Sequence, residues 1–251
     1  MLINAILYLW MTTAAFAAVF PYRAGDAFGK DRGLMPVDDA DNEGLIVGGE
    51  TAAIGDYPYF VTLYPEAGCG ASLIAPRVVL TAAHCTCNEI RDPITNRRLG
   101  CDGYRKQQFV VAGVFYRPLT TNWLTDGAVV RSVVEQRDHE EYDHLSLEND
   151  LTLMLLNEDA VPNVDSDVIL RLSNDPADML GPVTAIGLGR LFSNQQEGLP
   201  NELQEVELSG RSDAFCEGQW GTTFKRDVMM CAGVNGGNKS TCQVRPRALI
   251  D

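Results

Sequence analysis

Hydrophobic residues in this sequence form many short runs instead of long helical patterns. From position 46 onward, Val, Leu and Ile runs are separated by Gly, Pro and Asn, as at 60–63, 78–80, 151–156 and 183–186. Short apolar runs bounded by turn-forming residues predict short strands packed in barrels or a sandwich. We find no repeat of fixed period and no long amphipathic helix. The pattern therefore predicts an all-β fold.

The N-terminal stretch has a different pattern. Residues 2–20 are apolar apart from one Asn and two Thr, and Ala-Phe-Ala at 15–17 matches a signal-peptidase site. We interpret residues 1–17 as a cleaved signal peptide, which predicts a secreted, extracellular protein without stable membrane association. An uncleaved anchor is the alternative, because the run is almost long enough to span a bilayer and no Lys or Arg precedes it.

Two further segments lack the strand pattern. Residues 18–45 are rich in Gly, Asp and Pro and have no apolar periodicity, so they cannot bury enough surface to fold alone. We interpret them as an acidic prosegment. Residues 244–251 show neither a strand pattern nor a capped helix, and we interpret them as a tail unrelated to the preceding domain at 46–243.

The overall composition is consistent with one globular domain and excludes some partners. The chain has 251 residues, of which 45% are hydrophobic, enough for a sizeable core. Asp and Glu number 34 against 20 Lys and Arg, giving a formal charge of −14. Because this charge repels phosphate backbones, no nucleic-acid partner is expected.

Seven cysteines in a secreted chain predict disulfides, and the odd number leaves at least one cysteine without an intramolecular partner. Cys87 and Cys101 flank a mostly polar loop that contains Arg, Pro, Asn and Gly. We predict that these two cysteines are bonded and close that loop.

The motif TAAHC at Thr81–Cys85 is the first of several ordered landmarks. The others are IVGG from Ile46, NDLTLMLL from Asn149, GLGR from Gly187, LQEV from Leu203 and MCAG from Met230. In this order they resemble the trypsin and chymotrypsin family of serine proteases over 46–243. The resemblance implies two packed six-stranded antiparallel barrels with the active site between them. It also implies a serine-type endopeptidase that acts on protein or peptide substrates and needs no cofactor.

The resemblance assigns roles to individual residues. His84 matches the general base and Asp150 the carboxylate that orients it, in the order His, Asp, Ser of the trypsin-like triad. The resemblance also implies disulfides between Cys69 and Cys85 and between Cys216 and Cys231. Cys242 then remains unpaired, because its family partner would follow the catalytic serine.

The family's serine motif does not follow. Residues 235–243 read NGGNKSTCQ and are followed by VRPRALID, so GDSGGP is absent. That motif supplies both the nucleophile and the backbone donors of the oxyanion hole. We therefore expect an incomplete second barrel and a chain that is catalytically inactive as given. Two alternatives are a non-catalytic homologue acting as a binding protein and a translated fragment without function.

Activation and specificity are also implied by the resemblance. Family zymogens are cut before IVGG, here between Leu45 and Ile46, where trypsin-activated relatives carry Arg or Lys instead of Leu. Ser240 takes the position that is Asp in the pocket of trypsins. A neutral residue there predicts chymotrypsin-like preference for aromatic or large apolar side chains. Self-activation of the intact enzyme at Leu45 is a hypothesis that joins the two observations.

His139 and His144 lie among four acidic residues, a composition that could suggest a metal site. The helical two-histidine spacing and the cysteine pair of zinc sites are both missing. We interpret these residues as a solvated segment that leads to Asp150, and no metal is expected.

Overall fold

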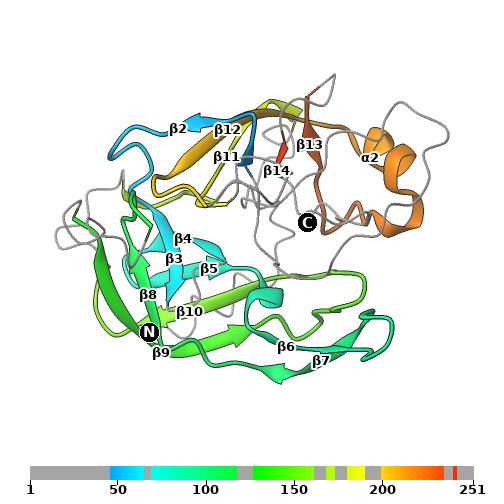
Figure 1. Cartoon of the computed structure of the whole chain (residues 1–251), viewed down its shortest axis with the longest axis horizontal. Coiled ribbons are helices and arrows are strands. Elements are labelled where there is room, and N and C mark those ends of the chain that lie inside the picture. Colours follow the sequence, from blue (N-terminus) through cyan, green and yellow to red (C-terminus); the bar gives the residue numbers. More distant parts are fainter. Residues whose placement is uncertain are drawn as a thin grey trace.

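The computed structural model of the chain describes residues 46–64, 69–117, 127–160, 168–172, 180–189, 199–234 and 240–241. Its first half is a closed antiparallel barrel of six strands in the order β10-β5-β4-β3-β8-β9 (Figure 1). These strands are β3 (Phe60–Tyr64), β4 (Gly70–Ala75), β5 (Val78–Thr81), β8 (Phe109–Ala112), β9 (Val129–Asp138) and β10 (Thr152–Leu156). The described residues contain no helix that is long and apolar enough to cross a membrane.

The barrel closes around aliphatic side chains. Along β10 the buried positions alternate, so that Thr152, Met154 and Leu156 point inward while the residues between them are half-buried. This alternation follows from the period of two in a β-strand. Met154 and Leu156 pack with Val61, Leu73 and other buried residues in one apolar cluster.

The second half is an antiparallel sheet. β11 (Pro182–Gly187) pairs with β12 (Gln204–Gly210), which also pairs with β13 (Ala232–Gly233) and with β2 (Glu50–Thr51). This four-stranded sheet does not close among the described residues. A second cluster, with Phe60, Val111 and Phe115 from the first half and Ile186 and Leu203 from the second, packs the halves together. The predicted all-β fold is confirmed.

A short helix and a strand pair complete the second half. α2 (Asp213–Trp220) begins after Ser212, whose Oγ accepts a hydrogen bond from Phe215 N, and a 3-10 turn, η5 (Gly221–Thr223), follows it. The Cys216–Cys231 disulfide joins α2 to the chain before β13. β1 (Ile46–Val47) pairs with β14 (Ser240–Thr241), so residues almost 200 positions apart form one ladder.

The polar loop after His84 forms a hairpin of its own. β6 (Cys87–Arg91) and β7 (Arg98–Tyr104) pair antiparallel, and the Cys87–Cys101 disulfide joins them. At the tip, Asp92 Oδ1 accepts hydrogen bonds from the backbone N–H groups of Ile94 and Thr95. Such an Asx turn reverses the chain. The hairpin extends away from the barrel in Figure 1.

Candidate functional site

His84 lies in a tight turn at the end of strand β5. The 3-10 turn η2 (Ala83–Cys85) is closed by hydrogen bonds from Cys85 N to Ala82 O and from Thr86 N to Ala83 O. Ala82 and Ala83 are buried, and the Cys69–Cys85 disulfide ties the turn to the start of β4. The backbone of His84 is therefore held by the barrel on one side and by the disulfide on the other.

Asp150 lies at the end of a sharply bent segment that precedes β10. Leu147 and Asn149 both have positive φ, of 60° and 57°. Asparagine tolerates this region, but leucine adopts it rarely because its Cβ crowds the backbone. The bend turns the Asp150 side chain inward, where it is only 4% exposed.

The two side chains form a close pair. Asp150 Oδ2 lies 2.6 Å from His84 Nδ1, and Asp150 Oδ1 accepts a hydrogen bond from the backbone N of His84 at 2.8 Å. Both carboxylate oxygens are therefore engaged by one residue, which fixes the ring's position and orientation. The hydrogen bond to the carboxylate requires a proton on Nδ1, so in the neutral ring Nε2 is the acceptor. The His84 side chain is 18% exposed, so solvent can reach it.

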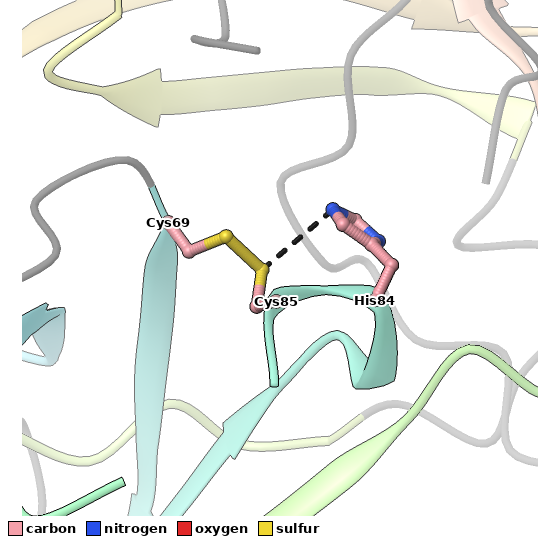
Figure 2. A group of neighbouring side chains, drawn as sticks. All are labelled: Cys69, His84 and Cys85. Carbon is pink, nitrogen blue, oxygen red and sulfur yellow. Dashed lines mark hydrogen bonds between the residues drawn. A yellow bond between two sulfur atoms is a disulfide. The ribbon is translucent and has the colours of Figure 1, made fainter. Parts of the chain in front are cut away.

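Figure 2 shows the His84 ring beside the Cys69–Cys85 disulfide, with Nε2 3.6 Å from Cys85 Sγ. The ligand atoms of Cys69, His84 and Cys85 lie within 4.8 Å of one another. Zinc binds thiolates, however, and here the two sulfurs are bonded to each other. The cluster is a disulfide packed against the His84 ring.

His144 corrects one interpretation of the sequence. We expected its segment to be solvated, but its side chain is buried. His144 Nδ1 lies 2.8 Å from Tyr142 Oη, and Nε2 lies 3.2 Å from Glu89 Oε1 on the hairpin. No signal in the sequence indicated the contact between His144 and Glu89, because these two residues are 55 positions apart.

The charges around His144 come mainly from the hairpin. Arg91 Nε lies 2.7 Å from Glu89 Oε2, and Arg98 Nε lies 2.7 Å from Glu89 Oε1. Burial raises the pKa of Glu89, but the bonds and charges of Arg91, Arg98 and His144 lower it on balance. Burial lowers the pKa of His144, and Glu89 only partly opposes this. His144 therefore favours the neutral form.

This shift gives a testable pH dependence. A histidine whose pKa is lower in the folded state than in the unfolded state stabilises the fold above its unfolded value, near 6.5, and this contribution is lost as pH falls through the folded value. We expect His144→Asn to flatten the decline in unfolding free energy between about pH 7.5 and pH 5. Denaturant titrations of both proteins at several pH values measure the difference. Parallel curves would contradict the prediction.

The other predicted site residues are only partly described. The backbone of Ser240 lies opposite Val47 in the β1–β14 ladder. Leu45, Cys242 and the segments 1–17, 18–45 and 244–251 lie outside the described residues. The disulfides are Cys69–Cys85, Cys87–Cys101 and Cys216–Cys231. His139 donates its backbone N–H to Leu151 O at 2.9 Å, and its Nδ1 accepts a hydrogen bond from Glu141 N.

Comparison with known proteins finds a family model and two relatives that are all described as trypsins. A family model described as trypsin matches residues 46–244. The chain is 30% identical over 207 residues to Trypsin Blo t 3 of Blomia tropicalis, covering 80% of this chain and 70% of that protein. It is 31% identical over 207 residues to Trypsin Tyr p 3.0101 of Tyrophagus putrescentiae, covering 80% of this chain and 65% of that protein.

Two further matches support less, one because it covers a small part of the relative and the other because its sequence identity is low. The chain is 29% identical over 214 residues to Serine protease filzig of Drosophila melanogaster, which is 80% of this chain but only 11% of that protein. A solved structure described as "Structure of GrC" matches with a TM-score of 0.56 at 22% identity, over 76% of each chain. At that identity the match supports the fold alone.

Proposed function

Because the chain belongs to the trypsin family, whose model matches residues 46–244, we propose that His84 and Asp150 are the general base and the orienting carboxylate of a secreted serine endopeptidase. The 2.6 Å contact between His84 Nδ1 and Asp150 Oδ2 carries this proposal. The enzyme acts on protein or peptide substrates, as trypsin-like proteases do. In this assignment no metal or organic cofactor takes part.

The pair performs proton transfer. Nε2 of His84 takes the proton from a serine hydroxyl as its oxygen bonds to the scissile carbonyl carbon, and the carbonyl electron pair moves onto the carbonyl oxygen. Asp150 stabilises the imidazolium through the Nδ1–H bond. The oxyanion then re-forms the carbonyl as the C–N bond breaks, and the imidazolium gives its proton to the leaving amine. The acyl-serine remains for hydrolysis by water.

We also propose that the 251-residue polypeptide does not catalyse this reaction by itself. Its sequence contains no GDSGGP motif, so it provides neither the family's nucleophile nor the adjacent oxyanion donors. Loss of a single oxyanion donor costs roughly two to three orders of magnitude in rate. A serine introduced alone therefore would not restore hydrolysis.

A paired assay tests both proposals. The first protein is the chain from Ile46 to Asp251, so that both proteins begin at the same residue. The second, here called the continued chain, begins at Ile46, runs to Gln243 and continues with the segment that follows the matching region of Trypsin Blo t 3. We expect only the continued chain to hydrolyse fluorogenic peptides, with Phe or Leu preferred over Arg or Lys because Ser240 is neutral. Hydrolysis by the first protein would refute its proposed inactivity. A folded but inactive continued chain would favour a non-catalytic binding protein.

Activation between Leu45 and Ile46 is part of the same proposal. Pairing of Ile46 with Thr241 and of Val47 with Ser240 supports it, because the new N-terminus would lie beside the strand that carries the pocket residue. We expect a chain with residues 18–45, continued after Gln243 in the same way, to process itself at Leu45. The His84→Ala variant should remain uncut in mass spectra. Equal processing of the two proteins would contradict self-activation.

A further inference from the structure

Asp138 is a half-buried acidic residue and one of the four that surround His139 and His144 in the sequence. It is the last residue of β9 and pairs with Thr152, the first residue of β10. Its Oδ1 accepts hydrogen bonds from Thr86 Oγ1 at 2.9 Å and from Thr152 Oγ1 at 2.6 Å. Gln136 Nε2 lies 3.2 Å from Oδ1 and 3.1 Å from Oδ2. One carboxylate therefore holds two threonines.

The positions of these threonines link Asp138 to the His84–Asp150 pair. Thr86 follows His84 by two residues, and Thr152 follows Asp150 by two residues. Both threonine side chains are buried. The two halves of the pair are 66 residues apart in sequence, and the shared oxygen of Asp138 connects the segments directly after them.

Further contacts surround Asp138 and its threonine partners. Thr86 Oγ1 also lies 3.1 Å from Ala83 O, which closes the turn that carries His84. Gln136 contacts the chain after the hairpin, with Nε2 3.1 Å from Arg105 O and Oε1 accepting from Gln107 N at 2.9 Å. Burial is the main cause that raises the pKa of Tyr104, and the negative charges of Asp138 and Asp150 raise it further. Both carboxylates thus act on the same phenol.

We propose that Asp138 is a positioning residue for the His84–Asp150 pair, acting through Thr86 and Thr152. The proposal rests on the proposed function of that pair. Hydrogen bonds to a carboxylate are stronger than neutral ones, and a catalytic pair needs its atoms held within about 0.5 Å. Without the two hydroxyl bonds, η2 and the start of β10 would remain in the barrel but could shift relative to each other.

Hydrogen exchange of the His84 backbone amide tests the proposal in the 251-residue chain. This amide donates to Asp150 Oδ1 at 2.8 Å, so its exchange rate reports how well the two segments are registered. We expect Thr86→Val and Thr152→Val each to accelerate this exchange on the order of tenfold, beyond any change explained by global unfolding. Thr86→Ser and Thr152→Ser retain the hydroxyl and should stay within about threefold of the unsubstituted chain.

A matched control is Thr62→Val. Thr62 is equally buried in the same barrel, but its hydroxyl faces Cys69 O, at 3.5 Å. Acceleration in this control equal to that in the Thr86 and Thr152 variants, or no rescue by serine, would overturn the proposal. If Thr152→Val does not fold, Asp138→Ala decides, because it removes the acceptor of both hydroxyls and leaves Thr86 Oγ1 beside Ala83 O. Unchanged exchange in that variant would overturn the proposal. Exchange needs no hydrolysis, so failure of the peptide assay and failure of this test are distinguishable.

Discussion

Replacing His84 by Ala in the continued chain is expected to lower kcat by between about ten-thousand-fold and a million-fold, the range known for serine protease triads. Without the imidazole, no group accepts the serine proton or returns it to the leaving amine. KM should change little, because His84 contributes to proton transfer more than to substrate binding. Steady-state kinetics on one fluorogenic peptide measures both constants.

The control for this variant is His139→Asn. His139 directly follows β9 of the same barrel, and its Nδ1 accepts a hydrogen bond from Glu141 N that an asparagine oxygen can also accept. This control should keep kcat within a factor of a few. If the His84 and His139 variants were equally active, His84 would not be the general base.

Replacing Asp150 by Asn is expected to lower kcat about ten-thousand-fold, as this exchange does in the family's triad. The asparagine amide can donate where Asp150 Oδ2 now accepts from His84 Nδ1. The ring would then place its proton on Nε2, the atom that must receive the proton from serine. The loss should be larger at neutral pH than in alkaline solution, where hydroxide can assist.

Asp159→Asn is the matched control, since Asp159 is an exposed carboxylate just beyond β10. We expect kcat unchanged within a factor of two. Far-UV circular dichroism and thermal unfolding of both variants would show that they are folded. An Asp150→Asn variant that is folded and as active as the control would exclude the proposed role of Asp150.

The features predictable from the sequence are those with a local signal. Alternating or continuous apolar runs identified strands that became β3, β5, β10 and β11. TAAHC and NDLTLMLL marked His84 and Asp150, and the structure brings these two residues together although 66 positions separate them. The motif predicted the partnership, but only the barrel's strand order explains it, because β10 pairs directly with β5.

Other features depend on tertiary contacts that no local pattern reveals. Glu89 reaches His144 across 55 positions, and Thr86 reaches Asp138 across 52. Asp138 is one of the four acidic residues around His139 and His144, and we expected it to be solvated because acidic side chains usually are; its threonine partners became evident only in the structure. The short helix α2 was also not predicted, since eight residues give too little periodicity.

The tautomer of the His84 ring is the most direct test of the central claim that this chain holds a preassembled general base. Long-range proton–nitrogen NMR correlations can resolve all three imidazoles of the 251-residue chain. At about pH 9, well above the ordinary imidazole pKa, we predict that His84 is protonated at Nδ1 and unprotonated at Nε2, and that Asp150→Ala abolishes this preference. A proton on Nε2 in the unsubstituted chain, or identical spectra for the two proteins, would contradict it.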